Sequence, residues 1–169
     1  MRDDLLSALS DVILLLVSAA VHEAGHLLAA KLIGVPFRRM KFCTAGGVIT
    51  FDFSGTSYLC EAFVHLGGSL FGMASALICY AVLSDAALGY LGVTVMLSAV
   101  NLLPVRGLDG GAVLSALLNM IFLPDTAERI TAVVSFVTWA VIWCAAVRFA
   151  LRGSRMIWPL IFAVGTALM

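Results

Sequence analysis

The sequence predicts an all-α polytopic membrane protein, and three observations support this fold class. Of its 169 residues, 62% are hydrophobic and only 12% are charged. Soluble domains carry roughly a quarter charged residues, so this chain has too little polar surface for a water-soluble globule. The apolar residues also fall into long runs, and a run of about 20 apolar residues can cross a bilayer. Counting these runs gives about five to six expected transmembrane helices.

The expected helices follow one another along the whole chain. The runs that predict membrane spans are residues 5–33, 62–83, 87–103 and 130–150, with a short final one at 157–169. The apolar run 110–123 is too short to span a bilayer alone. The first run has no clearly basic flank and continues past a possible cleavage site, so we interpret it as a retained helix and not a signal peptide.

Residues 34–60, between the first two runs, are more polar and predict a short re-entrant β-hairpin. The stretch 48–53 mixes β-branched and aromatic residues, with Thr50 and Asp52 interrupting the apolar positions. Such a mixture is typical of a short strand, here expected at the membrane surface. A Gly46-Gly47 pair directly precedes it and marks a change of chain direction.

Basic residues predict the orientation of the first spans. They cluster just after the first helix, at Lys31, Arg38, Arg39 and Lys41. Because cytoplasmic loops carry an excess of basic residues, this end of the first helix should face the cytoplasm. The topology after residue 110 stays open. The basic residues near Arg148 are cytoplasmic if 110–123 crosses alone, and outside if it is the lower half of a broken helix.

The length of the chain allows one domain, residues 1–169, with a core at 5–123 and additional helices at 130–169. The apolar composition predicts the lipid bilayer as a partner, and the formal net charge of zero gives no indication of nucleic acid. The four cysteines form no CxxC pair, so we interpret them as small apolar residues and not as disulfides or metal ligands.

A cluster of ionisable residues, His22-Glu23-Ala24-Gly25-His26, lies inside the first apolar run. Positions i and i+4 share one helical face, so both imidazoles can reach one metal ion, with Glu23 beside a bound water. Ionisable groups in an apolar helix cost several kcal/mol unless they are paired or functional. The pattern therefore favours a metal site over a chance match. A catalytic zinc takes three protein ligands and leaves one position open.

The third ligand is expected in the segment 101–111, where Pro104 and three glycines break a helix. Irregular backbone at membrane depth is tolerated only where it is buried in protein or lines a wet cavity. Asp109 would be an unpaired charge there unless it meets a cation. His65 is the alternative third ligand, but we favour Asp109 and interpret His65 as a hydrogen-bonded interior histidine.

Together, the motifs His22-Glu23-x-x-His26 and Asn101-x-x-Pro104-x-x-x-x-Asp109-Gly110-Gly111 resemble the site-2 protease family of intramembrane zinc metalloproteases. The loop and strand at 46–48 are similar to the hairpin of that family. The resemblance implies one Zn²⁺ per chain, held by His22, His26 and Asp109, with Glu23 as the catalytic base. It also implies that Asn101 binds the substrate backbone or the developing oxyanion, with a helix-cap role as the alternative.

The resemblance further implies an endopeptidase in a bacterial cell membrane that cuts a transmembrane or membrane-adjacent segment of a regulatory protein near the cytoplasmic face. Its expected partner is a membrane-embedded protein substrate, and its oligomeric state is open. A non-catalytic zinc-binding membrane protein (pseudoprotease) and a metal transporter are the alternatives. The first should lack a ligand or the base, and the second should carry further intramembrane ligands, for which only His65 is available.

Overall fold

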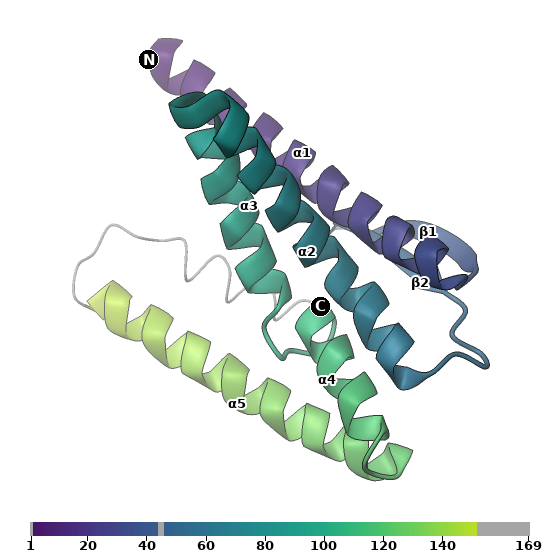
Figure 1. Cartoon of the computed structure of the whole chain (residues 1–169). Helices are drawn as coiled ribbons and strands as arrows, with labels where there is room; N and C mark the ends of the chain where they lie inside the picture. The colour runs from purple at the N-terminus through teal and green to yellow at the C-terminus, as the bar shows by residue number, and fades with distance from the viewer. Residues whose placement is uncertain (1, 44–45, 152–169) are drawn as a thin grey trace.

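The computed structural model describes residues 2–43 and 46–151 of the chain. In chain order, its elements are α1 (Arg2–Ile33), β1 (Phe37–Cys43), β2 (Gly46–Phe51), α2 (Tyr58–Leu83), the 3₁₀ turn η1 (Ser84–Ala87), α3 (Leu88–Asn101), α4 (Asp109–Asn119) and α5 (Pro124–Leu151) (Figure 1). The predominance of helices and the hairpin after the first helix confirm these two parts of the predicted architecture.

Three helical stretches of the described chain are long and apolar enough to cross a membrane: Ala8–Ile33, Tyr58–Asn101 and Pro124–Arg148. The prediction of about five to six spans exceeds this number. One reason is that α2, η1 and α3 form a continuous apolar stretch of 44 residues. Another is that α4 has 11 residues, which at about 1.5 Å per residue is roughly half the hydrocarbon thickness. The expected span 157–169 lies outside the described residues.

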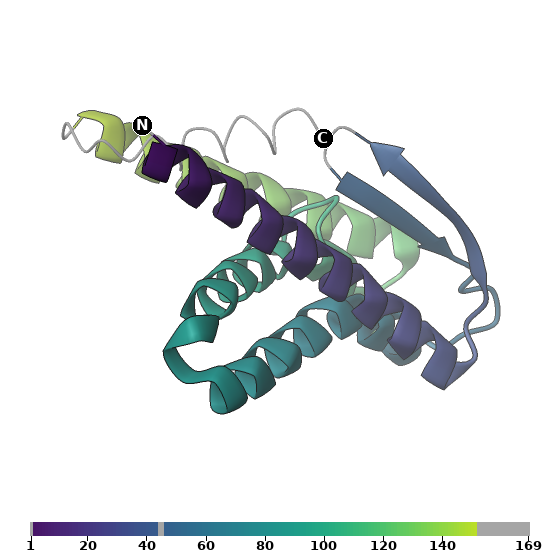
Figure 2. The same cartoon turned by 90° about the horizontal axis from the view of Figure 1, so that it is seen from above.

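Helix α2 is the centre of the helix packing. It packs against α1, α3 and α4, and α1 also contacts α3 (Figures 1 and 2). Within the α1–α3 contact, the hydroxyls of Ser18 and Thr94 lie 3.0 Å apart and are buried. Helix α5 packs mainly against α4 and diverges from the other helices (Figure 1). As a result, residues of α5 and residues of α1 to α4 line the same cavity, which is described below.

Small residues bring α1 and α2 into close contact. A Cβ atom added to Gly67 of α2 would lie 2.6 Å from Cβ of Ala29 and 2.9 Å from the carbonyl oxygen of Gly25, both in α1. Helices in membranes associate through such small-residue surfaces because close backbone approach maximises van der Waals contact. The His-Glu motif of α1 therefore faces α2 at short distance.

The hairpin is attached to the helices at the end of α1. Strands β1 and β2 are antiparallel, and Phe37 pairs with Phe51 near the open end of the hairpin. Phe51 and Phe53 pack on a buried cluster that includes Val64 of α2. The structure confirms the predicted strand, but β2 covers residues 46–51, so it begins and ends two residues earlier than the predicted 48–53.

An ion pair also closes the base of the hairpin. The Arg38 guanidinium donates to the Asp52 carboxylate over 2.8 Å, and the Ser54 N–H donates to the same carboxylate over 3.1 Å. The hydrogen bonds from Ser54, and then the Arg38 guanidinium, lower the pKa of Asp52 to about 2. The pair is therefore fully charged at neutral pH, which suits a position at the membrane surface.

The predicted helix break is confirmed between Asn101, the last residue of α3, and Asp109, the first residue of α4. The chain turns back on itself so tightly that Cβ atoms at Gly110 and Gly111 would overlap the carbonyl oxygens of Leu102 and Val105. Only glycine fits at these two positions. The break thus places Asp109 in the first turn of α4, where α4 packs on α2.

The close contact between α1 and α2 predicts that Gly67→Ala destabilises the protein. Overpacking of this kind costs typically about 1–3 kcal/mol, so the thermal unfolding midpoint in detergent should fall. Gly92→Ala in α3 is the matched control, because a Cβ atom there meets nothing within 4 Å and alanine is the better helix former. Equal midpoints for the two variants would contradict the packing described here.

Candidate metal centre

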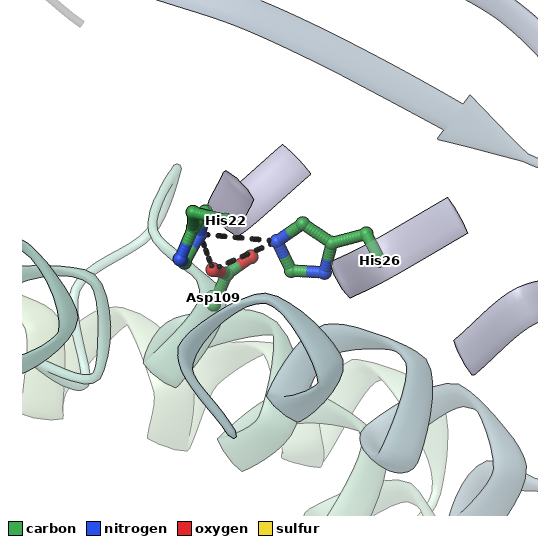
Figure 3. Close-up of side chains that lie close together, drawn as sticks. All are labelled: His22, His26 and Asp109. Carbon is green, nitrogen blue, oxygen red and sulfur yellow. Dashed lines mark hydrogen bonds and ion pairs between the residues drawn. The ribbon is translucent and has the colours of Figure 1, made fainter. Parts of the chain in front are cut away.

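Helix α1 places the two motif histidines on one face, one turn apart. Their Nε2 atoms lie 3.1 Å from each other, and the rings are edge-to-face with centroids 4.8 Å apart. Both residues are buried, with exposed fractions of 5% for His22 and 6% for His26. The spacing that predicted a shared site from the sequence thus brings both imidazoles to one point (Figure 3).

The third group comes from the start of α4. Oδ2 of Asp109 lies 2.9 Å from Nε2 of His22 and 3.2 Å from Nε2 of His26, across 87 residues of sequence in the first case (Figure 3). One ligand atom from each of these three residues lies within 4.8 Å of the others. The predicted set His22, His26 and Asp109 is therefore brought together by the fold.

The hydrogen bond on the far side of His26 indicates what this cluster can hold. Nδ1 of His26 lies 2.8 Å from the carbonyl oxygen of Val64. A carbonyl only accepts, so Nδ1 carries a proton, and a neutral imidazole then presents the lone pair of Nε2 to the cluster. Histidine ligands of metals are usually oriented in this way. Lone pairs beside a carboxylate repel one another unless a cation lies between them, and two imidazoles with one carboxylate are a typical catalytic zinc set.

Gly68 of α2 makes room for both imidazoles. A Cβ atom at this position would overlap Nε2 of His26 and lie 2.8 Å from Nε2 of His22. The Gly67-Gly68 pair was visible in the sequence, but its two different contacts were not predicted. Gly67 contacts the backbone of α1, whereas Gly68 faces the ring nitrogens.

A cavity of about 580 Å³ opens next to the cluster. Glu23 and Asn101, the two residues predicted to act in catalysis, line it together with the three candidate ligands. Its wall also contains residues that the sequence did not single out, from β2, the helix break, α4 and α5: Ile49, Phe51, Arg106, Ser115, Asn119, Glu128 and Thr131. The α4 part of this wall could have been predicted from Ser115 and Asn119, because these polar residues lie four apart, on one helical face of an apolar stretch.

The two remaining candidates lie at the edge of the cluster. Asn101 is the last residue of α3, whereas the cap positions on either side of the break are Leu102 and Leu108, so the structure does not give Asn101 the alternative helix-cap role. His65 differs from the predicted interior histidine. Its side chain is 24% exposed, lines the cavity, and lies with Nδ1 3.7 Å from Oδ1 of Asp109.

Helix α5 is connected to the helix break next to Asp109. The backbone N–H of Arg106 donates to Oγ of Ser135 over 3.0 Å. The Arg106 guanidinium donates to the carbonyl oxygen of Glu128 over 2.9 Å and to its carboxylate over 3.3 Å. Because α5 packs mainly on α4 elsewhere, these bonds hold the α5 wall of the cavity beside the His22–His26–Asp109 cluster.

Apolar helices that could span a membrane and enclose a zinc-type donor set fit the class of membrane-embedded metallopeptidases. Comparison with known proteins is consistent with this class. The sequence model of the protein family Peptidase family M50 matches residues 11–95 of the chain. The chain belongs to this family of zinc peptidases, the site-2 proteases, and is an integral membrane protein. A search of curated proteins found no match.

A solved structure has the same fold. It is a site-2 protease from Methanocaldococcus jannaschii, which is 23% identical in sequence with a TM-score of 0.65. The match covers 92% of this chain and 75% of the other. The family match ends before Asn101 and Asp109, so the assignment of Asp109 to the metal centre depends on the distances given above.

The position of Gly68 predicts that Gly68→Ala weakens zinc binding by roughly tenfold or more, since an overpacking cost above about 1.4 kcal/mol corresponds to this factor. Zinc affinity would be measured by competition with a chelator. Gly72→Ala, one turn further along α2, is the control, because its Cβ would meet Thr94 at an ordinary 3.4 Å. Unchanged affinity in Gly68→Ala would show that the imidazoles do not occupy the described positions when metal is bound.

Proposed function

We propose that this protein is an intramembrane zinc endopeptidase of the His-Glu-x-x-His type. It would cleave a transmembrane or membrane-adjacent segment of a regulatory protein, near the cytoplasmic face of a bacterial cell membrane. The observation that supports this most strongly is that Glu23 lines the same cavity as the three donors His22, His26 and Asp109. The whole of residues 1–169 would act as one multi-pass protease domain.

In this proposal, His22, His26 and Asp109 hold one Zn²⁺ per chain. Zinc at this position supplies a Lewis acid for the scissile carbonyl and lowers the pKa of water. The donor chemistry supports the assignment, because the Val64 carbonyl directs the lone pair of His26 into the cluster. Both histidines are nearly buried, yet they line the cavity through which a water could reach the open position of the metal.

Glu23 is the general base of the proposed reaction. It follows His22 directly in α1 and reaches the cavity, so its carboxylate can take the proton of the attacking water and return it to the leaving amine. Asn101 lies on the wall of the same cavity. Its side-chain amide would donate a hydrogen bond to the substrate carbonyl, where negative charge develops in the transition state.

The substrate of this site must present an extended peptide segment, because a helix shields its own peptide bonds. Strand β2 supplies a docking edge for such a segment. It pairs only with β1 in the described two-stranded sheet, and its residues Ile49 and Phe51 line the cavity. A substrate strand added to this edge would lie beside the candidate catalytic groups and gain main-chain hydrogen bonds.

The two alternative functions are less well supported by the site. A pseudoprotease has no need for a carboxylate in position to act as a base, whereas Glu23 lines the cavity. A transporter requires a series of metal-binding groups along a path. Within residues 2–43 and 46–151, the His/Cys/Asp/Glu groups that could hold a metal form one cluster.

The role of Glu23 predicts that Glu23→Gln abolishes cleavage while one zinc per chain remains. Loss of a general base typically costs about 10²–10⁴ in rate. The assay would use a liposome-reconstituted reporter with one transmembrane helix that contains a central Asn-Pro-Gly break. Glu61→Gln, an equivalent change in the first turn of α2, is the control.

Cleavage by the native chain and by Glu61→Gln, but not by Glu23→Gln, supports the proposal. Equal cleavage by all three proteins would exclude Glu23 as the base. Full loss of zinc in Glu23→Gln would instead give Glu23 a role in holding the metal.

A further inference from the structure

We propose that His65 is a positioning residue that holds one oxygen of Asp109 so that the other oxygen is directed at the metal. This inference depends on the proposed metal site and adds a group that the two sequence motifs do not contain. His65 would not touch substrate or metal. It would act through Asp109.

The geometry of the Asp109 carboxylate supports this division of roles. Its Oδ2 atom faces Nε2 of His22 at 2.9 Å and Nε2 of His26 at 3.2 Å. Its Oδ1 atom faces Nδ1 of His65 at 3.7 Å. Ligating carboxylates are normally oriented by a hydrogen bond to the oxygen that does not bind the metal. The 3.7 Å separation is longer than a hydrogen bond, and the proposed role requires it to shorten through rotation of either side chain.

His65 is unsuitable as a fourth ligand. Its Nδ1 atom approaches Oδ1 of Asp109 and not the Oδ2 atom that contacts both histidines, and the group of mutually close ligand atoms consists of His22, His26 and Asp109. A catalytic zinc also requires an open position beside its three protein ligands. A fourth protein ligand would occupy this position.

One turn of α2 would then serve two of the three ligands. The backbone carbonyl of Val64 accepts the hydrogen bond from Nδ1 of His26. The next residue, His65, directs its own Nδ1 at Asp109. The Val64 bond fixes an imidazole from α1, and the His65 contact fixes a carboxylate from α4. Helix α2 packs against both of these helices.

The hairpin in turn restrains His65. The ring of Phe53, two residues after β2, lies with its centroid 5.6 Å from that of His65 and is tilted by 42°. Phe53 also packs on the buried cluster around Val64. The ring of His65 therefore contacts both Phe53, which follows the hairpin, and Asp109. A displacement of Phe53 would therefore shift His65, and through it the proposed ligand Asp109.

The test measures zinc affinity of the full chain in detergent by competition with a chelator, for the native protein, His65→Ala, His65→Asn and His65→Gln. Loss of an outer hydrogen-bond partner typically weakens metal binding about 10–100-fold. We expect this loss in His65→Ala, with one zinc per chain retained at saturating zinc. Asn places its amide N–H near the position of Nδ1, whereas the Gln amide lies nearer that of Nε2. His65→Asn should therefore restore affinity, and His65→Gln should not.

The visible spectrum of the cobalt-substituted proteins identifies the ligand set independently of affinity. The same spectrum in the native protein and in His65→Ala supports a positioning role. Native affinity in His65→Ala, or no recovery in His65→Asn, would overturn the inference while leaving the metal site in place. A changed cobalt spectrum with loss of stoichiometric zinc in His65→Ala would overturn it in favour of a direct ligand. Absence of zinc binding by the native protein would contradict both this inference and the proposed function.

Discussion

The contact of Asp109 with the His22–His26 pair joins segments that lie 87 residues apart, and the packing of α1, α2 and α4 brings these groups together. These groups are inside a chain whose helices are apolar enough to cross a membrane. There, a carboxylate beside two imidazoles is costly unless a cation or proton compensates it. The fold brings the three groups together despite that cost. This is the physical reason to interpret the cluster as a metal centre and not as ordinary packing.

Glycine makes this contact possible at three places. Gly67 lets the backbones of α1 and α2 approach each other, and Gly68 leaves space for the imidazoles. Gly110 and Gly111 let α4 begin directly against the helix break, so that Asp109 is directed at α1. In each case a single methyl group would displace an element that carries a ligand. The site is therefore sensitive to small changes in α2, which contributes none of the three candidate ligands, as well as in α4.

The parts of the site that could be predicted were local in the sequence. The i, i+4 spacing of His22 and His26 follows from helix geometry, and Pro104 with its neighbouring glycines indicated the break before Asp109. The hairpin was predicted from residues 48–53, whereas β1, with its basic Arg38, was not recognised as a strand. Its charge resembles that of an ordinary loop, and its pairing with β2 is a non-local property.

The parts that could not be predicted depend on tertiary packing. The predicted number of spans exceeds the three stretches of the described chain, because counting apolar runs separates α2 from α3, which are joined through η1, and adds 157–169, which lies outside the described residues. The contact of the Val64 carbonyl with His26 could not be predicted, since any residue can supply a backbone acceptor. The contact of His65 with Asp109 could not be predicted either, because the two residues lie far apart along the chain. The cavity wall from α5 was missed because its attachment requires the Arg106–Ser135 bond.

Zinc-edge X-ray absorption spectroscopy of the purified native chain would test the metal centre most directly. Ligation by His22, His26 and Asp109 predicts a shell of nitrogen and oxygen atoms at about 2.0–2.2 Å, with the outer scattering of two imidazoles and no sulfur near about 2.3 Å. A sulfur shell would contradict this ligand set, because it would place cysteine on the metal in place of Asp109 or a histidine. A shell of oxygen atoms without imidazole scattering would equally exclude the His22–His26 pair as ligands.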